Sequence, residues 1–344
     1  TGPLFQVDFT DFGAVIQASA TIWAEVQSTR FPERAVALVD EIEEGRPQLI
    51  GLQEVARFIN LDGQGRPIGS LDFLEVLESE IASRGLAYTR IAVQENTSVT
   101  LPIAFDPALG VTELVNFSDR DVVLARSDVS IKAVANGTYA TTFSLAEGVT
   151  LKRGWIRVTT RRRGVPFHFV NTHLESQALA PVQAGQLQEL LGSVVAGLDG
   201  VTVLVGDLNS DAEAGPGVPS WTPSYDELIG QGFVDAWEQS DASSDQPGFT
   251  CCNDPDLTNL ESLFDQRIDF VLFRENWHLP IERLIDDVDA EVLGEELDDL
   301  TVGGLWPSDH GGLLARQRMG DRRMIASGKS TRSEGSGRSR RGRR

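Results

Sequence analysis

Side chains that can bind a metal ion or a phosphate stand at or next to the ends of five short apolar segments of this chain. They are carboxylates, carboxamides and imidazoles, with one guanidinium. A carboxylate at a strand end is usually solvated and a lone histidine is usually structural, so no single segment identifies a site. The five sets are Gln53 and Glu54; Asn171 and His173; Asp207 and Asn209; Arg267 and Asp269; and Asp309 and His310.

Three of these sets consist of residues two positions apart in the sequence. Because side chains alternate between the two faces of a strand, each such pair projects from one face. Together the sets predict a cluster of carboxylates around two imidazoles, with two carboxamides as neutral donors. Carboxylate oxygens select Mg²⁺ or Mn²⁺, and imidazoles neutralise the charge of a phosphate. The residue types therefore indicate phosphate chemistry at a divalent cation.

Apolar residues at helical spacing predict helices over 32–44, 74–81 and 187–198. We expect Ser70 to cap the second helix and Gly85 to end it. Between the helices lie apolar runs typical of strands covered on both faces. This alternation predicts an α/β protein, with sheet packed on sheet or helix on sheet.

The predicted strands follow one another along most of the chain. The segment 161–164, Arg-Arg-Arg-Gly, separates two of them and is typical of a solvated hairpin tip, with a phosphate contact as the alternative. The strands cover 48–53, 99–105, 121–125, 155–160, 165–171, 201–205 and 268–273.

The order of the polar motifs resembles that of the endonuclease/exonuclease/phosphatase superfamily, which includes DNase I-like nucleases, abasic-site endonucleases, inositol polyphosphate phosphatases and neutral sphingomyelinases. The resemblance implies a four-layer α/β sandwich, two β-sheets face to face with helices outside, here over residues 1–318. Segment 118–126 and the cysteine pair resemble a bacterial branch of uncertain substrate. The motifs are LQEV, NTHL, GDLN, RIDFVL and SDH, between Gln53 and His310.

The resemblance also implies a metal site. Glu54 would be the principal Mg²⁺ ligand, with Mn²⁺ as the alternative ion and Asp309 in or near the metal shell. Members of the superfamily usually open with a strand that carries a metal-binding asparagine. Here the first asparagine is Asn60, and residues 1–10 show no buried strand, so we expect that strand to be missing from this chain.

The resemblance assigns the reaction itself to residues near the other motifs. Asp207 would position or activate the attacking water, and Asn209 would hold that water and the phosphate. His310 would contact the phosphate as an acid/base, with Asp269 fixing its ring. His173 and Asn171 would bind substrate, and His173 would also assist the leaving group. For Arg120, Asp121 and Arg267 we expect a structural role.

Charge is unevenly distributed along the 344 residues, whose net charge is −21. Residues 316–344 contain eleven Lys or Arg and two acidic residues, so the first 315 residues carry −30. A body this acidic repels nucleic acid unless a cation intervenes. Residues 319–344 are predicted to be a disordered basic tail, solvated or in contact with phosphate polymers or a membrane. The acidic stretch 286–299 is expected to be a surface loop or short helix.

The two cysteines, Cys251 and Cys252, are adjacent, which favours a plain loop pair over a vicinal disulfide. No apolar run is long enough for a membrane helix, and the chain as given shows no signal peptide. The acidic body of the chain and the resemblance to that bacterial branch weakly favour a secreted protein. We expect a monomer.

The leading functional hypothesis is a Mg²⁺-dependent phosphodiesterase or endonuclease, with nucleic acid as the favoured partner. A phospholipid or sphingomyelin phosphodiesterase and a small-molecule phosphatase are the enzymatic alternatives. An aromatic-rich exposed loop would favour lipid, and Trp221, Tyr225 and Trp237 are its candidates. A catalytically impaired binding module is the alternative of another class.

Overall fold

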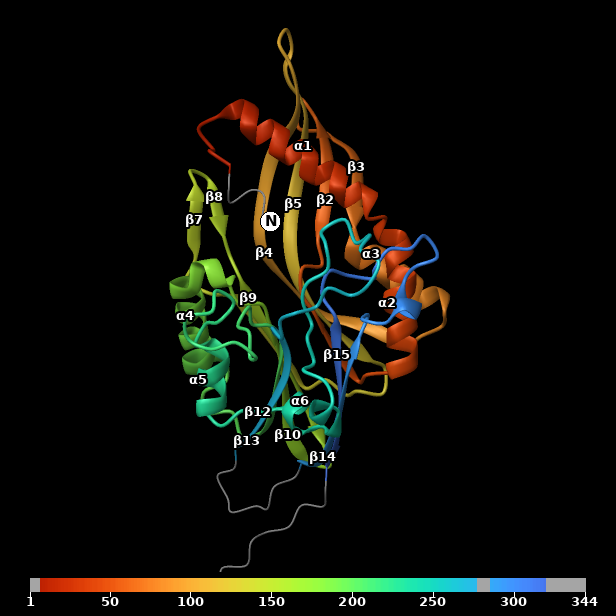
Figure 1. Cartoon of the computed structure of the whole chain (residues 1–344), viewed down its shortest axis with the longest axis vertical. Coiled ribbons are helices and arrows are strands. Elements are labelled where there is room, and N and C mark those ends of the chain that lie inside the picture. Colours follow the sequence, from red (N-terminus) through yellow and green to blue (C-terminus); the bar gives the residue numbers. More distant parts are fainter. Residues whose placement is uncertain (1–6, 277–284, 320–344) are drawn as a thin grey trace, which may run out of the picture.

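The computed structural model describes residues 7–276 and 285–319. Two helices come first, α1 (Phe12–Ser28) and α2 (Phe31–Gly45). Helix α1 was not predicted from the sequence; Asp11 caps it by accepting a hydrogen bond from the backbone N–H of Ala14 at 3.0 Å. It packs on strand β4 (Tyr88–Asp106), where the Phe12 ring meets the edge of Phe105 (Figure 1).

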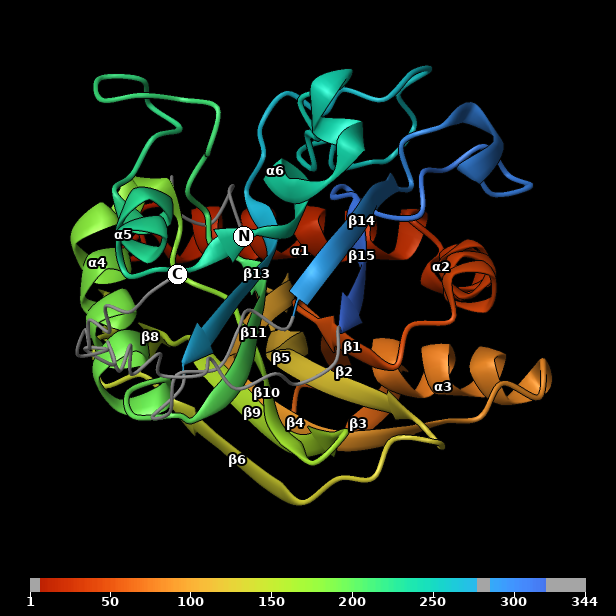
Figure 2. The same ribbon diagram turned by 90° about the horizontal axis from the view of Figure 1, so that it is seen from below.

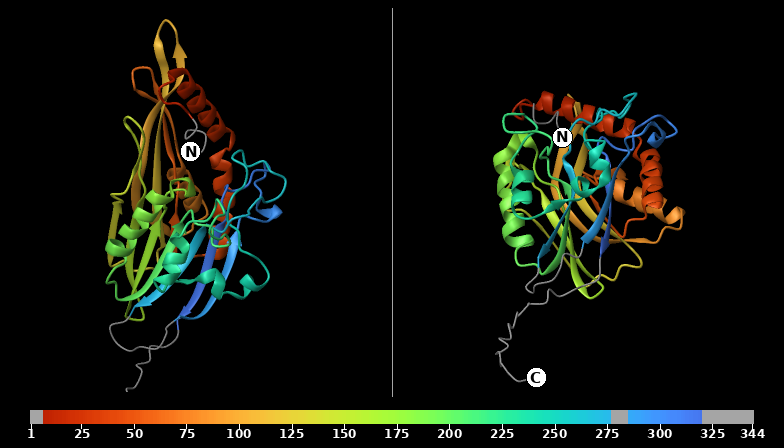
Figure 3. Two further views of the ribbon diagram at one scale, coloured as in Figure 1. Left: turned by 60° about the vertical axis from the view of Figure 1, so that its left-hand side comes forward. Right: turned by 60° about the horizontal axis from the view of Figure 1, so that its bottom comes forward.

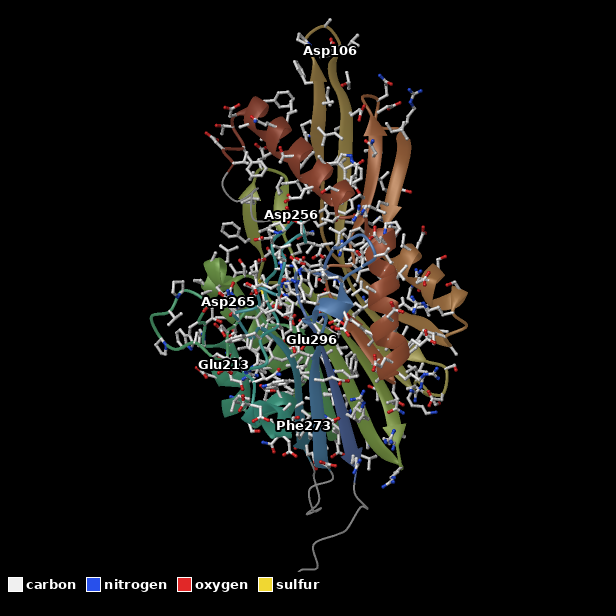
Figure 4. The ribbon with its side chains drawn as sticks, turned by 45° about the vertical axis from the view of Figure 1, so that its right-hand side comes forward. Asp106, Glu213, Asp256, Asp265, Phe273 and Glu296 are labelled. Carbon is white, nitrogen blue, oxygen red and sulfur yellow. A yellow bond between two sulfur atoms is a disulfide. The ribbon has the colours of Figure 1, made fainter. Side chains whose placement is uncertain are left out.

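The first sheet, sheet A, is antiparallel and is built around one long strand, β5. Strands β1 and β2 pair with successive parts of one side of β5, β3 pairs with β2, and β4 pairs with the other side. The hairpin of β4 and β5 projects beyond the rest of the sheet, with Asp106 at its tip (Figures 3 and 4). The strands are β1 (Leu49–Leu52), β2 (Arg57–Asp62), β3 (Pro67–Asp72), β4 and β5 (Gly110–Arg126).

The second sheet, sheet B, has six strands in the order β12-β13-β11-β10-β9-β6. Its centre is the parallel pair β10 and β11, whose ends carry the predicted site residues. The predicted hairpin tip is confirmed: Arg162 pairs with Val165, and Arg163 and Gly164 both have positive φ, as a two-residue turn requires. The strands are β6 (Ala133–Thr138), β9 (Gly154–Arg162), β10 (Val165–Thr172), β11 (Gly200–Asp207), β12 (Val234–Asp235) and β13 (Asp269–Asn276).

Two short ribbons accompany the sheets: β7 (Phe143–Ala146) with β8 (Val149–Leu151), and β14 (Ile285–Leu293) with β15 (Gly312–Met319). Strand β14 corrects the prediction of a loop or short helix over 286–299. Val288 and Ala290 are buried while Asp287 and Asp289 are exposed, so the acidic residues form the solvent face of a strand. Only residues Leu297–Asp299 form a helical turn.

The remaining helices refine the other predictions. Helix α3 (Phe73–Ser83) is capped by Asp72, whose carboxylate accepts from the N–H groups of Leu74 and Glu75, and not by Ser70, which lies in β3. The predicted helix 187–198 instead begins at Ala180 as α4 and ends in a π-helical turn at Val194. The short helices are α4 (Ala180–Glu189), α5 (Ser224–Gly230) and α6 (Ala236–Gln239), with 3₁₀ turns at Gln177–Leu179, Asp241–Ser244 and Leu297–Asp299.

Buried side chains lie in three layers that define the architecture. Val123, Phe169 and Val203 belong to the core between the two sheets. A second core lies between sheet B and α4, and a third between sheet A and helices α2 and α3. Figure 2 shows the resulting order of helices, sheet A, sheet B and helices. The predicted four-layer α/β sandwich, with two packed β-sheets flanked by helices in the DNase I-like manner, is confirmed.

Within the described part of the chain, no helix is long and apolar enough to cross a membrane. The predicted basic tail, 319–344, lies outside the described residues after position 319.

Candidate active site

One end of a cavity of about 1000 Å³ gathers most of the predicted site residues. The cavity runs along β1 and β15 and reaches the strand ends of sheet B. Strand ends from both sheets and the loop before β15 therefore converge on one place, although the residues are up to 256 positions apart in the sequence. The site residues that line it are Glu54, His173, Asp207, Asp269, Asp309 and His310.

Asp207 and Asp269 are brought together by the pairing of β11 with β13, in which they are direct partners. Asp269 in turn binds His310, with its Oδ2 atom 3.0 Å from Nδ1 of the ring. The hydroxyl of Thr250 donates to the same carboxylate oxygen at 2.8 Å. Two hydrogen bonds thus fix the carboxylate that orients the histidine, as the sequence analysis proposed for Asp269.

The pKa of His310 lies well above its ordinary value. Burial alone would lower it, but the carboxylates of Asp269, Asp207 and Asp309 favour the imidazolium and outweigh burial. Because Nδ1 is held by Asp269, the proton on Nε2 is the one that can be presented to another molecule. His310 is therefore suited to donate a hydrogen bond or a proton to an anionic group.

His173 stands at the end of β10 beside Asp207 and Asn209. Its Nε2 atom lies 3.3 Å from Asp207 Oδ2 and 3.1 Å from Asn209 Nδ2. In the neutral ring Nδ1 accepts from Arg153 at 2.9 Å, since a guanidinium can only donate, and the ring proton then faces Asp207. Burial and Arg153 lower the pKa of His173, but Asp207 and Glu54 outweigh them and raise it. The neighbouring carboxylates thus make both histidines easier to protonate than a free imidazole.

Asn209 holds Asp207 as well as lying beside His173. Its backbone N–H donates to Asp207 Oδ1 at 2.7 Å and its side-chain amide donates to Oδ2 at 3.2 Å. Burial would raise the pKa of Asp207, but His173 and these hydrogen bonds hold it below its usual value. Asp207 is thus an ionised carboxylate in a nearly buried place.

Glu54 directly follows β1 in a left-handed conformation, with φ of 52°. Such a conformation is costly for glutamate and persists only where neighbours impose it. Here the N–H of Val55 donates to the carbonyl of Arg120 at 2.8 Å, and Arg120 Nε donates to the carbonyl of Val55 at 2.9 Å. The turn leaves the side chain of Glu54 57% exposed, at the mouth of the cavity.

Arg153, which the sequence analysis missed, lies behind these residues with only 12% of its side chain exposed. It contacts Glu54 at 3.7 Å, Asp119 at 3.4 Å and Glu175 at 3.6 Å, besides His173. The protein atoms around the cavity mouth would raise the pKa of the half-exposed Glu54, but the charges of His173 and Arg153 outweigh this effect and lower it. A single arginine thus holds three carboxylates and one imidazole in place.

Replacing Arg153 with methionine is expected to lower the free energy of unfolding by about 3 to 5 kcal/mol, because it leaves buried carboxylates without a cation. Chemical denaturation measures the loss. Arg90→Met is the matched control: Arg90 pairs with Glu78 at the surface, where an ion pair is worth about 0 to 1 kcal/mol. Equal losses in the two variants would contradict the account of Arg153.

Asp119 and Asp121 form a buried acidic pair behind Arg153. Asn96 donates to Asp121 Oδ2 at 2.9 Å, while Oδ1 of each aspartate is buried with no hydrogen-bond partner among the described residues. Burial, and then the charge of Asp119, raises the pKa of Asp121 to about 7. The D-x-D alternation in β5 was the sequence signal for both, and only Asp121 was singled out.

The raised pKa of Asp121 predicts a pH-dependent stability. Between the ordinary pKa of 3.8 and about 7, the unfolded chain has lost a proton that the folded chain keeps, so this group makes the fold less stable as pH rises. Asp121→Asn removes the effect. Its stability relative to wild type should rise by about 2 to 3 kcal/mol from pH 5 to pH 8, at about 1.4 kcal/mol per pH unit. Urea denaturation at both pH values tests this, with Asp245→Asn as an exposed control, and a constant difference would contradict it.

The loop that carries Asp309 is held by two residues from elsewhere in the chain. Arg34 of α2 donates to the carbonyl of Pro307 at 2.9 Å. Asn253 donates its N–H to the carbonyl of Asp309 at 2.9 Å and its side-chain amide to that of Ser308 at 3.3 Å. These contacts present Asp309 at the cavity with its side chain exposed.

Asn171 is the one predicted substrate-binding residue that the structure removes from the site. It is fully buried, and its amide donates to the carbonyls of Leu52 and Val122 at 3.1 and 3.2 Å. Its oxygen accepts from Gln53, and it packs so closely on Gly51 that a Cβ there would collide with it. Asn171 links sheet B to sheet A, so its prediction as a substrate ligand is wrong.

Arg120 and Arg267 have the structural roles expected of them. Arg120 pairs with Asp72 at 2.5 Å, in addition to holding the turn after Glu54. Arg267 is almost fully buried and pairs with Asp235, Glu213 and Glu238. Neither side chain lines the cavity.

Cys251 and Cys252 lie directly beside His310. The Sγ atom of Cys251 lies 3.6 Å from His310 Nε2, and that of Cys252 lies 4.0 Å from it. The pair therefore contacts the His310 ring without lining the cavity. The sequence offered no sign of this contact.

The residues at this end of the cavity fit a divalent cation that prefers oxygen. One ligand atom each of Asp207, Asp269 and His310 lies within 4.8 Å of the others. Glu54 and Asp309 stand outside this trio, although both face the same cavity. Four carboxylates around one space repel one another unless a cation lies between them, and their oxygens suit Mg²⁺ or Mn²⁺.

A family model covers most of the chain: that of the Endonuclease/Exonuclease/phosphatase family matches residues 22–310. The chain belongs to this family. Endonuclease/exonuclease/phosphatase proteins are metal-dependent phosphoesterases, so the chain is a hydrolase of phosphate esters that requires a divalent metal. The family membership and the enzyme class that the motifs predicted are both confirmed. No curated protein matches the chain by sequence.

Solved structures of the family share the fold at low identity. A family protein from Leptotrichia buccalis C-1013-b aligns with a TM-score of 0.53 and 17% identity, covering 84% of this chain and 93% of that one. Truncated TDP2 from Caenorhabditis elegans aligns with a TM-score of 0.52 and 16% identity, covering 84% of this chain and 91% of that one. A family protein from Beutenbergia cavernae DSM 12333 aligns with a TM-score of 0.55 and 23% identity, covering 84% of this chain and 66% of that one. These similarities establish the fold.

Proposed function

We propose that this endonuclease/exonuclease/phosphatase protein is a Mg²⁺-dependent phosphodiesterase that acts on nucleic acid. The observation that carries the proposal is the presence of an ionised carboxylate, Asp207, close to a protonated histidine, His310, at one end of the cavity. A low pKa on one group and a raised pKa on the other supply an acid and a base at the same pH. Such an arrangement suits in-line attack by water on a phosphate ester.

The chain's own residues have separable tasks in this reaction. Asp207 accepts a hydrogen bond from the attacking water and orients it, while Asn209 holds the carboxylate and reaches the phosphate. His310 donates from Nε2 to a phosphate oxygen, with Asp269 fixing its tautomer. His173 lies 3.3 Å from Asp207 and would assist the leaving group.

Glu54 and Asp309 would hold the Mg²⁺, with Mn²⁺ as a substitute, and the bound cation would neutralise charge that develops on the phosphate oxygens. The turn that exposes Glu54 and the loop contacts that present Asp309 support this assignment. Asp207 and Asp269 line the same end of the cavity, so they could also contact the cation.

Nucleic acid is the favoured substrate. TDP2 from D. rerio, which has the same fold at a TM-score of 0.50 and 17% identity, has been solved in complex with a single strand DNA product. The aromatic residues that would have favoured a lipid surface do not form an exposed loop. Trp237 is buried, and Tyr225 stacks on Phe270 at 4.9 Å and donates to Asp235 at 3.0 Å. Trp221 is half-buried and donates to Asp226 at 3.2 Å.

A comparison of three substrates tests the proposal: supercoiled plasmid, sphingomyelin vesicles and p-nitrophenyl phosphate, each with Mg²⁺ or with excess chelator. We expect Mg²⁺-dependent nicking of the plasmid, with little release of phosphocholine or p-nitrophenol. Asp207→Ala is the control for a contaminating nuclease. Faster turnover of vesicles or of the monoester would replace the nucleic-acid proposal by one of those two classes. No turnover of any substrate would favour a binding module.

A further inference from the structure

The only two cysteines of the sequence are held against His310 by the backbone. Cys251 forms isolated antiparallel β-bridges with Gln266 on one side and with His310 on the other. The N–H of Cys251 donates to the carbonyl of Gln266 at 3.1 Å, and the N–H of Gln266 donates back to the carbonyl of Cys251 at 3.0 Å. The place of Cys251 and of its neighbour Cys252 beside the ring is therefore set by paired backbone.

Asp269 leaves the other nitrogen of the His310 ring to the cysteines. Its Oδ2 atom lies 3.0 Å from Nδ1 and also accepts from the hydroxyl of Thr250 at 2.8 Å, which fixes the carboxylate. A histidine that binds a metal through one nitrogen almost always donates the other N–H to a carboxylate, carbonyl or water, and this contact orients the ring and raises its basicity. His310 has this arrangement, with Nε2 as the nitrogen left for a metal.

The distances from Nε2 to the two sulfurs suit a tetrahedral cation. Nε2 lies 3.6 Å from Cys251 Sγ and 4.0 Å from Cys252 Sγ. In a tetrahedral zinc site, with Zn–S of about 2.3 Å and Zn–N of about 2.0 Å, a sulfur and a nitrogen ligand lie about 3.5 Å apart. The three ligand atoms also lie within 4.8 Å of one another. One cation can therefore contact all three, displacing the protons of the thiols and of Nε2.

A cation can reach this place from solvent. Cys251 is buried, but Cys252 is exposed and the His310 side chain is 29% exposed. Three protein ligands leave the fourth tetrahedral position to water, as in the Cys₂His type of zinc site. The acidic body of the chain also attracts cations. The site is thus both accessible and electrostatically favourable for a divalent metal.

The donor atoms distinguish this group from the carboxylates on the other side of His310. Thiolate sulfur and imidazole nitrogen select Zn²⁺, whereas carboxylate oxygens select Mg²⁺. His310 belongs to both candidate groups, one with Asp207 and Asp269 and one with Cys251 and Cys252. A thiophilic cation and the catalytic reaction therefore compete for the same ring.

We propose that Cys251, Cys252 and His310, with both cysteines reduced, form a Zn²⁺ site distinct from the oxygen-rich metal site, and that Zn²⁺ bound there blocks catalysis. The bound ion occupies Nε2, the atom that donates to the phosphate in the proposed function. The blocking of catalysis rests on that proposed function, whereas the binding of Zn²⁺ does not.

Co²⁺ is the probe for the site, because thiolate sulfur bound to Co²⁺ gives an intense charge-transfer absorption that carboxylate oxygen does not give. The full chain is reduced, freed of reductant without oxygen and titrated with Co²⁺. We expect the thiolate absorption to saturate at one Co²⁺ per chain and to disappear when Zn²⁺ is added. Absence of the absorption from the reduced chain would overturn the proposal.

Cys252→Ser and His310→Gln test the ligands. Cys252 is exposed, so its replacement by serine leaves the packing intact. We expect at least about 10-fold weaker Co²⁺ binding by each variant, because each loses one of three protein ligands. His168→Gln, which changes a histidine bonded to Thr159 instead, should bind as the wild type does. Unchanged affinity in Cys252→Ser or in His310→Gln would contradict the assignment.

Glu54→Gln and Cys252→Ser together separate the two metal sites. Glu54→Gln should keep the thiolate absorption, and its loss there would overturn the separation of the sites. Cys252→Ser should nick plasmid with Mg²⁺ as the wild type does and need at least about 10-fold more Zn²⁺ for inhibition. Equal inhibition by Zn²⁺ would refute the blocking of catalysis. If the wild type turns over no substrate, the proposed function fails, while the absorption titration still decides the zinc site.

Discussion

Replacing His310 with alanine is expected to lower kcat by about 10² to 10⁴ while leaving the fold intact, which is the range that general acid–base groups contribute. The reason is that the raised pKa of His310 keeps its ring protonated. Asp269 Oδ2 holds Nδ1 at 3.0 Å, so Nε2 is left to donate to the phosphate. Alanine removes that donor and leaves Asp269 without its partner. Single-turnover assays on a phosphodiester substrate measure the effect on the chemical step.

His168→Gln is the matched control for His310. His168 lies in β10 and bonds to Thr159 at 3.0 Å and to the carbonyl of Asp199 at 3.2 Å, but it does not line the cavity. The control should keep near-normal turnover at temperatures where it is folded. Turnover by His310→Ala within a few-fold of wild type would contradict the role assigned to His310.

Asp207→Ala is expected to cause a loss of similar size, about 10² to 10⁴ in kcat. Asp207 lies 3.3 Å from His173 and within 4.8 Å of a ligand atom of His310, and it is held ionised by His173 and Asn209. Its loss removes the group that orients the attacking water and leaves His173 without its carboxylate partner. Thermal unfolding should show a folded protein, because Asp207 ends β11 and is not part of the apolar core.

Asp207→Asn separates charge from shape, since the carboxamide keeps the hydrogen-bond geometry and loses the negative charge. We expect it to be nearly as impaired as Asp207→Ala if the charge matters for water activation. Recovery of most activity in Asp207→Asn would show that Asp207 only positions its neighbours. Normal turnover in Asp207→Ala would remove it from the catalytic residues.

The motif residues were predictable because each follows an apolar strand, and parallel or paired strands end at a common edge. Asp207 and Asn209, for example, both lie beside His173 as predicted, although Asn209 lies beyond the end of β11 in a left-handed conformation and not on a strand face. The alternation of side chains along a strand misled for Asn171. It indicates which residues share a face, but not whether that face looks toward a substrate or, as here, toward the other sheet.

Residues without a motif could not be found in this way. Arg153 comes from the residues before β9, and nothing in the local sequence shows that three carboxylates from distant strands surround it. Arg34 holds the Asp309 loop across 273 positions of sequence. Such contacts are set by the packing of α2 and the two sheets, which a local pattern does not encode.

The sequence of β14 has the alternation typical of a strand, but its many acidic residues obscured that pattern. Buried Val288 and Ala290 alternate with exposed Asp287 and Asp289, as the two faces of a strand require. The high charge of this stretch favoured a solvated loop instead. Helix α1 was not predicted, although Asp11 is a typical N-cap, because it buries only Val15 and the polar Ser19 and so lacks a clear apolar stripe.

The most direct test of a metal-dependent phosphodiesterase at this site is a Mg²⁺ titration of plasmid nicking by wild type and by Glu54→Gln. Glutamine preserves the shape of the proposed metal ligand and removes its charge. We predict activity that vanishes with excess chelator, returns with Mg²⁺, and in Glu54→Gln requires at least 10-fold more Mg²⁺ or stays low at saturation. Nicking that persists in chelator, or identical Mg²⁺ dependence in the two proteins, would contradict the account.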